Sequence, residues 1–191
     1  MNTETALLSI DIQNDYFPGG RMELFAPLEA ALKASALLDF FRRNKFPVVH
    51  IAHESVRPGA TFFLPATVGQ EIHTLVKPEN GECVITKNFP NSFLGTPLLE
   101  HLRRLDVSRL VVAGMMTHMC VDATTRAAVD LGFDCRLIHD ATATRGLSFA
   151  DVTVPAAQVK AAFLAALTVL CARVQTADEF FAENGGPRAA L

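Results

Sequence analysis

Residues 6–12 read Ala-Leu-Leu-Ser-Ile-Asp-Ile, a short and almost continuous apolar run. Such a run is typical of a strand that is buried on both faces, as in parallel sheets. Other strand-like segments occur at residues 47–52, 83–87, 109–113 and 133–138, and residues 173–176 could form a sixth strand. Helical patterns separate them at residues 27–44, 96–104, 121–131, 156–170 and 177–183. This alternation predicts an α/β fold in which a six-stranded parallel sheet lies between two layers of helices.

The 191 residues are expected to form one domain over 1–191. Thr176 and Glu179 have the spacing of a capping box at the start of the last helix. The tail 184–191 contains Gly185-Gly186-Pro187 and is expected to fray. The one long segment without a pattern, residues 54–80, includes the apolar cluster 62–65. Long loops in compact domains are usually functional, so this cluster could form the wall of a pocket.

Composition narrows the classes of function. Half of the residues are hydrophobic and the net charge is −3, which argues against a protein that binds the phosphate backbone of a nucleic acid. No apolar run reaches the ~18 residues of a membrane span. Residues 1–5 hold no basic residue, and the four cysteines show no CxxC spacing. We therefore expect free thiols, a cytoplasmic location, and neither a nucleic-acid nor a membrane partner.

Several motifs are missing from the sequence. It has no GxGxxG after the first strand, no GxxxxGK[ST], no HExxH and no GxSxG. Nucleotide binding and serine hydrolase chemistry are therefore disfavoured.

Three reactive residues fall where predicted strands end, which is where ligands bind in parallel α/β sheets. They are Asp11, Lys87 and Cys120. Each has a plain structural interpretation by itself: a capping carboxylate, a solvated strand end and a small buried residue. Cys120, however, is predicted to open a helix, whose unpaired N–H groups lower a thiol pKa and can form an oxyanion hole. Three other cysteines are expected to serve packing: Cys83, Cys135 and Cys171.

These three residues could act as a base, a cation and a nucleophile. An ordinary thiol and an ordinary carboxylate differ by about 4.6 pKa units, or about 6 kcal/mol for proton transfer. The pair works only if burial raises the pKa of Asp11 while the helix end and Lys87 lower that of Cys120. The lysine is therefore a requirement of this chemistry.

With these motifs the sequence resembles the isochorismatase-like cysteine hydrolases, a family that includes nicotinamidases and N-carbamoylsarcosine amidohydrolase. The resemblance covers residues 6–175. It is carried by the motifs at residues 8–17 (LSIDIQNDYF), 86–87 (TK), 114–121 (GMMTHMCV) and 140–141 (DA).

The resemblance implies a catalytic triad of Asp11, Lys87 and Cys120. It also implies a cis peptide at Met115–Met116, and an oxyanion hole formed by the N–H groups of Met116 and Cys120. The strand order it implies is 3-2-1-4-5-6, with Asp11 and Cys120 on adjacent strands. The implied reaction is hydrolysis of a small-molecule amide or related C–N bond through a thioester.

Nicotinamidases carry a metal site with an Asp-x-His signature after the second strand. The matching stretch here, His50-Ile51-Ala52-His53-Glu54-Ser55, lacks it. Because side chains alternate along a strand, His50 and His53 should face opposite sides. We therefore expect no metal and no cofactor, and His53 should line the pocket or bond to a loop.

Further substrate contacts are expected near these motifs. They are Gln13, Phe17, His53, Phe62, Asn91, Thr117 and His118. His118 could equally cap the helix, and the phenylalanines could belong to the core. Arg126 should lie away from Cys120 and form a structural ion pair or a subunit contact.

Other functions are considered beside the hydrolase. Isochorismatases of the same family cleave a vinyl ether and lack the cysteine, and a redox sensor would need a resolving cysteine close by. The alternative kept open is a catalytically idle member that acts as a binding or assembly module. The expected partner is a small-molecule substrate, and the family commonly forms homo-oligomers from dimers to octamers.

Overall fold

The computed structural model describes residues 4–170 and 172–186. Its strands are β1 (Thr5–Ile10), β2 (Val48–His53), β3 (Cys83–Lys87), β4 (Arg109–Met115), β5 (Asp134–Ala143), β6 (Leu147–Phe149), β7 (Val152–Val154) and β8 (Ala172–Gln175). Its α-helices are α1 (Pro27–Arg43), α2 (Leu98–Arg104), α3 (Asp122–Asp130), α4 (Ala156–Leu170) and α5 (Ala177–Asn184). A π-helical turn, Thr117–Val121, leads into α3.

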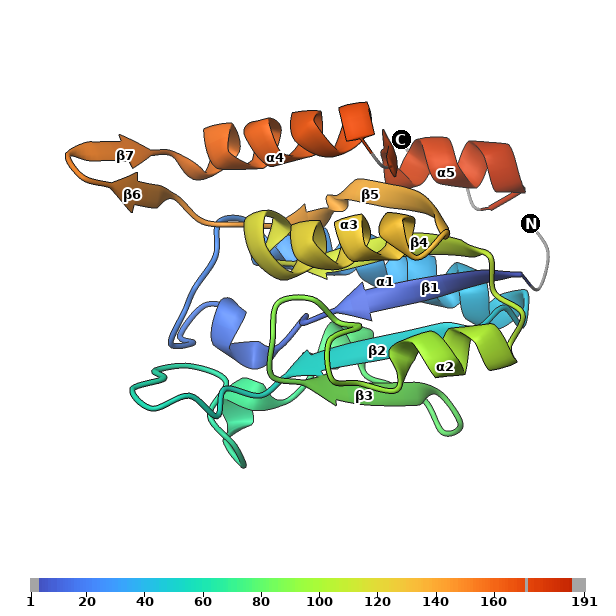
Figure 1. Cartoon of the computed structure of the whole chain (residues 1–191), viewed down its shortest axis with the longest axis horizontal. Coiled ribbons are helices and arrows are strands. Elements are labelled where there is room, and N and C mark those ends of the chain that lie inside the picture. Colours follow the sequence, from blue (N-terminus) through green and yellow to red (C-terminus); the bar gives the residue numbers. More distant parts are fainter. Residues whose placement is uncertain (1–3, 171, 187–191) are drawn as a thin grey trace.

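Six strands form one parallel sheet in the order β3-β2-β1-β4-β5-β8, with helices on both faces (Figure 1). The predicted order is confirmed, because β8 is the sixth strand of this sheet. A hydrophobic core lies on each face of the sheet, and the side chains of β1 point alternately into one core and the other. Leu7 packs on the face that α1 and α5 cover, and Leu8 packs on the face of α2, α3 and α4. The continuous apolar run at the start of the chain thus serves both faces.

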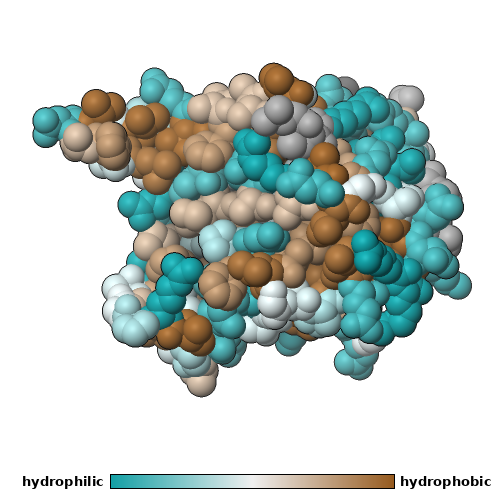
Figure 2. Space-filling view, viewed as in Figure 1, coloured by the Kyte–Doolittle hydropathy of each residue, from teal (hydrophilic) through white to brown (hydrophobic). Residues whose placement is uncertain are grey.

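Two elements differ from the expectation. β5 extends beyond residue 138 because its pairing with β4 resumes after a bulge, where Met115 lies opposite Ala143. The hairpin β6–β7 was not predicted, since its short strands carry no buried alternation. It projects from the body beside α4, and its Phe149 is 87% exposed (Figures 1 and 2). Self-association of the chain stays a prediction.

The end of the chain follows the expected local chemistry. Thr176 and Glu179 form the predicted capping box of α5, and Gly185 closes this helix with a φ of 71°. Most of the tail expected to fray, residues 187–191, lies outside the described residues, as does Cys171. Among the described residues, no helix is both long and apolar enough to cross a membrane.

Gly114 allows β1 and β4 to approach closely beside the carboxyl end of the sheet. Its φ is 139°, and a Cβ atom there would collide with the carbonyl oxygen of Ile10. Gly132 also has a positive φ, 92°, but faces open space. A side chain at Gly114 would meet both backbone strain and a steric collision, whereas one at Gly132 would meet the backbone strain alone.

We expect Gly114→Ala to lower the free energy of unfolding by more than about 3 kcal/mol, because backbone atoms must move apart. Gly132→Ala should cost only about 1 kcal/mol, from the positive φ alone. Urea unfolding followed by circular dichroism measures both. Equal losses for the two variants would show that the contact with Ile10 does not constrain the sheet.

Candidate active site

Asp11, Lys87 and Cys120 meet at the carboxyl edge of the sheet. Asp11 follows β1, Lys87 ends β3, and Cys120 lies in the π-helical turn after β4. The Nζ atom of Lys87 lies 2.7 Å from Oδ2 of Asp11 and 3.3 Å from Sγ of Cys120. All three side chains are buried. The structure thus brings together the three residues that the sequence singled out.

Backbone geometry after β1 and β4 sets these positions. Asp11 has a φ of 50°, and its N–H donates to the carbonyl oxygen of Ile51 on β2. A positive φ at a residue other than glycine is uncommon and is often found at functional sites. On the neighbouring strand, the Met115–Met116 peptide bond is cis, and the turn that carries Cys120 begins directly after it.

His53 completes the surroundings of Lys87. Its Nδ1 lies 3.0 Å from the lysine Nζ. Because an ammonium group has donors and no acceptor, Nδ1 must be the unprotonated ring nitrogen, and the ring proton lies on Nε2. Burial, followed by the charge of Lys87, lowers the pKa of His53 to about 4, so the ring is neutral near pH 7.

The backbone of His53 is held by a side chain from the first motif. Gln13 Oε1 accepts from the His53 N–H at 2.7 Å, and Gln13 Nε2 donates to the His53 carbonyl at 2.9 Å. This pair of bonds resembles the ladder between two strands, and it continues the pairing of β1 with β2. Gln13 therefore positions His53, and its own side chain is fully buried.

The resting pKa of Cys120 differs in direction from the expectation. Burial raises the pKa of this thiol, the Asp11 carboxylate raises it further, and Lys87 only partly opposes them. The argument from the helix N-terminus failed because it left out desolvation, which is the largest effect at this position. Burial also works against the charge of Lys87, but Asp11 and Cys120 together raise the lysine pKa. The resting site is therefore a neutral thiol beside an ammonium–carboxylate pair.

The same groups include donors that a metal could use. One ligand atom each from Asp11, His53 and Cys120 lies within 4.8 Å of the others, a mixed set that would suit a soft divalent cation. Lys87, however, is bonded to all three residues, so the cation that they surround is an ammonium group. His50 lies elsewhere, with Nε2 2.9 Å from Glu82, as the alternation of side chains on β2 predicts.

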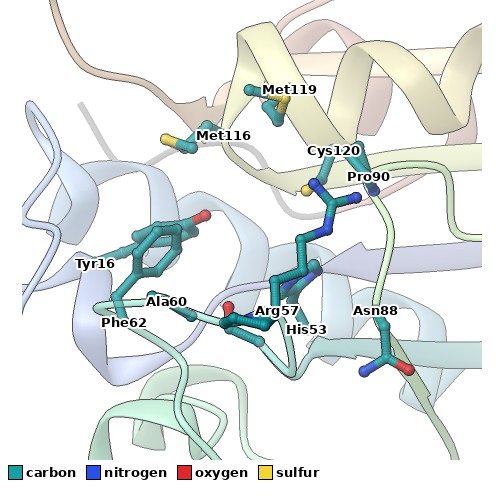
Figure 3. Close-up of a pocket in the computed structure, with 13 residues that line it drawn as sticks. Tyr16, His53, Arg57, Ala60, Phe62, Asn88, Pro90, Met116, Met119 and Cys120 are labelled. Carbon is teal, nitrogen blue, oxygen red and sulfur yellow. The ribbon is translucent and has the colours of Figure 1, made fainter.

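A cavity of about 380 Å³ opens onto Cys120, a size suited to a small molecule (Figure 3). Four of the residues that the sequence assigned to the site line it: His53, Phe62, Met116 and Cys120. Nine further residues contribute to the lining: Tyr16, Ser55, Arg57, Pro58, Gly59, Ala60, Asn88, Pro90 and Met119. Most come from the loop after β2, which supports the interpretation of this long segment as a pocket wall.

Five expected substrate contacts are absent from the lining of this cavity, because their side chains bond to other parts of the protein. Gln13 holds His53, and Phe17 stacks on His73 with ring centroids 3.7 Å apart. The remaining three bond within the chain: Asn91 Oδ1 accepts from Phe93 N–H, Thr117 bonds to Thr142, and His118 bonds to Thr144. Proximity to a motif along the chain therefore did not predict contact with the cavity.

Of the lining residues that sequence reasoning missed, Tyr16 carries a recognisable signal and Arg57 does not. Tyr16 lies within the first motif, and its ring packs 4.5 Å from that of Phe63. Arg57 lies in the loop after β2, where residues 54–80 have no periodicity from which a facing direction could be read. Arg126, by contrast, pairs with Asp122 within α3, one of the two structural roles expected for it.

The chain matches a known family of hydrolases along most of its length. The isochorismatase domain model matches residues 5–179. An uncharacterized isochorismatase family protein, YddQ of Bacillus subtilis, is 49% identical over 92% of this chain and 98% of its own. The solved structure of an isochorismatase hydrolase homologue from Oleispira antarctica has a TM-score of 0.91 and 47% identity, covering 95% of this chain and 98% of the other.

A relative with a named activity is the nicotinamidase/pyrazinamidase of Mycobacterium tuberculosis, which is 30% identical over 79% of this chain and 91% of its own. The chain belongs to the isochorismatase family and is a hydrolase of that family. Its six-stranded, three-layer architecture is the fold of these relatives.

Asp11 and Lys87 shift the pKa of Cys120 in opposite directions, so substitutions of the two residues should have opposite effects on this thiol. Asp11→Asn removes the negative charge that raises the pKa of Cys120, so more thiolate forms at a given pH. Lys87→Met removes the opposing positive charge, so less forms. We expect the pH midpoint of alkylation by iodoacetamide to fall by about one unit in the first variant and to rise in the second, and one unit changes the thiolate fraction about tenfold.

Intact-mass spectrometry follows this alkylation, with peptide mapping to exclude the other cysteines. In the wild type the rate should still be rising above pH 9, because the thiol pKa is raised. A wild-type rate that rises with pH to a plateau with its midpoint below pH 8 would contradict the buried neutral thiol.

Proposed function

We propose that the protein is a cysteine-dependent hydrolase of a small-molecule amide or related C–N bond, with Asp11, Lys87 and Cys120 as its catalytic triad. The observation that carries this proposal is the contact of one buried ammonium with both the carboxylate and the thiol. A base and a nucleophile held together by a cation at the floor of a cavity form an arrangement suited to nucleophilic catalysis.

In this proposal Asp11 takes the thiol proton. Its Oδ2 is bonded to Lys87, while its buried Oδ1 has no hydrogen-bond partner in the part of the chain that the structure describes. A buried oxygen without a donor is costly, and Sγ of Cys120 lies within 4.8 Å of a carboxylate oxygen of Asp11, so a small shift of the thiol would supply the donor. Proton transfer from Cys120 to Asp11 would leave a thiolate beside the Lys87 ammonium, which stabilises it.

The reaction then balances in two halves. The thiolate attacks the amide carbonyl, and the N–H groups of Met116 and Cys120 are proposed to stabilise the oxyanion. Asp11 returns its proton to the leaving amine as the C–N bond breaks, which leaves a thioester on Cys120. Water gives a proton to Asp11 and attacks the thioester, and the thiol recovers that proton as the acid product leaves.

Lys87 holds charge in this scheme and does not supply the proton. Its three N–H donors are matched by the acceptors on Asp11, His53 and Cys120, so none is left for the substrate. The amine therefore receives its proton from Asp11. His53 satisfies the third donor and acts as a positioning residue for the lysine.

The comparisons support the amide class without naming the substrate of this chain. The nicotinamidase/pyrazinamidase relative acts, by its name, on nicotinamide and pyrazinamide. The isochorismatase reaction remains less favoured, because Cys120 lies at the floor of the cavity. An idle binding module remains the alternative, but it gives no reason for a buried ammonium to contact a thiol.

Cys120→Ala should abolish the release of ammonia or amine from any amide that the wild type hydrolyses, a loss of at least about 10³-fold, since the nucleophile itself is removed. Cys83→Ser is a matched control, because Cys83 is a half-buried thiol on β3 outside the cavity lining. It should keep nearly full activity.

A coupled ammonia assay against a panel of small primary amides and N-carbamoyl compounds measures this effect. Acid quenching followed by intact-mass analysis should trap the acylated enzyme on the peptide that contains Cys120. Unchanged turnover in Cys120→Ala would refute the thioester route.

A further inference from the structure

The cavity over Cys120 has mostly apolar walls and one formally charged side chain. Tyr16, Phe62, Met116 and Met119 supply much of the apolar surface. Of the described residues that line this cavity, Arg57 is the one Lys, Arg, Asp or Glu. The triad charges lie beneath, where the Lys87 ammonium and the Asp11 carboxylate are paired with each other. Arg57 therefore determines the sign of the potential that a ligand meets in the cavity.

Arg57 is directed at the reactive centre. It comes from the loop after β2, and its guanidinium reaches toward Cys120 and Pro90 (Figure 3). Its carbon Cζ stacks over the ring of Phe89, 5.7 Å from the centroid, which limits where the side chain can go. Its charge is one of the influences that lower the pKa of His53, as expected for a cation that faces the site.

This guanidinium has no carboxylate partner within residues 4–170 and 172–186. Some other arginines are paired with a carboxylate, as Arg42 is with Glu82 and Arg109 with Asp134. A planar guanidinium offers parallel N–H donors that match the two oxygens of a carboxylate. The guanidinium of Arg57 is therefore free to bind an anion inside the cavity.

We propose that Arg57 recognises a carboxylate on the substrate, so that the preferred substrates are small amides that carry a carboxylate group away from the scissile bond. The inference that the ligand is a substrate rests on the proposed function. The binding of an anion by Arg57 does not depend on hydrolysis. The apolar walls would contact the carbon chain between the two groups, and Arg57 would orient the amide over Cys120.

Alkylation of Cys120 by two reagents tests the subsite without any substrate. Iodoacetate and iodoacetamide have nearly the same size, but only the first is an anion. The ratio of their rates on Cys120 at pH 8, divided by the same ratio for glutathione, measures the preference for a carboxylate. We expect Arg57→Gln to lower this normalised ratio about fivefold or more and Arg57→Lys to lower it less, because the charge remains without the fork.

Arg103→Gln is the matched control, since it removes the same charge from the exposed face of α2, outside the cavity lining. It should leave the ratio unchanged. An unchanged ratio in Arg57→Gln overturns the proposal, and so does an equal fall in Arg103→Gln, which would indicate net charge alone. Thermal melting checks that the variants are folded. Because the Arg57 side chain is exposed, its replacement should leave the fold intact.

Steady-state kinetics separates this inference from the proposed function. Succinamate and the neutral methyl ester of succinamate form a pair of primary amides that differ in one charge. The wild type should prefer succinamate in kcat/KM, and Arg57→Gln should remove most of that preference. If neither these two amides nor any compound of the panel is hydrolysed while the alkylation ratio still depends on Arg57, the hydrolase proposal fails and the anion subsite stands. A preference for the ester in the wild type overturns the subsite.

Discussion

The contact between the buried ammonium of Lys87 and the buried carboxylate of Asp11 constrains the rest of the structure. Neither side chain is accessible to solvent, so each charge has lost its hydration and needs a complete set of partners in the protein. Those partners come from β1, β3, the end of β2 and the turn after β4. Four segments distant in sequence must therefore end at the same point, and the parallel sheet in the order β3-β2-β1-β4 is the arrangement that lets them do so.

This constraint also explains the resting state of the site. With one buried cation and one buried anion, the charges already balance, and a thiolate would add a second negative charge in a poorly solvated place. The resting thiol is therefore neutral, and in the proposed mechanism its proton moves onto Asp11. The proton shift conserves the net charge of the buried group, so the site can pass between its two states without taking a proton from solvent.

Much of the fold followed from periodicity and strand endings. The apolar run at residues 6–12 and its five counterparts predicted the sheet, and Thr176 with Glu179 predicted the start of α5. The three reactive residues could be found because the carboxyl ends of parallel strands meet. The direction of the Cys120 pKa could not be predicted in this way, because it depends on burial that the turn itself does not reveal.

The walls of the cavity were harder to predict for a different reason. Thr117 and His118 neighbour the thiol along the chain, but the π-helical turn directs them toward β5 and the segment just after it, where they bond to Thr142 and Thr144. Arg57 belongs to a loop with neither a 2-residue nor a 3.6-residue repeat, and such a loop gives no indication of which side chains face inward. Residue contacts in loops depend on tertiary anchors such as Asp15, which holds the Phe63 backbone at 2.6 Å.

The position of the Lys87 nitrogen has a consequence for the lifetime of the catalyst. An acyl group carried by Cys120 would lie next to an amine only 3.3 Å from the sulfur. A neutral lysine there would capture the acyl group as a stable amide and inactivate the protein in one turnover. In the proposed thioester the sulfur carries no charge, but the Asp11 carboxylate still raises the lysine pKa, so the nitrogen would keep its proton and have no lone pair to offer. The same charge that favours the thiolate thus protects the protein from acylating itself.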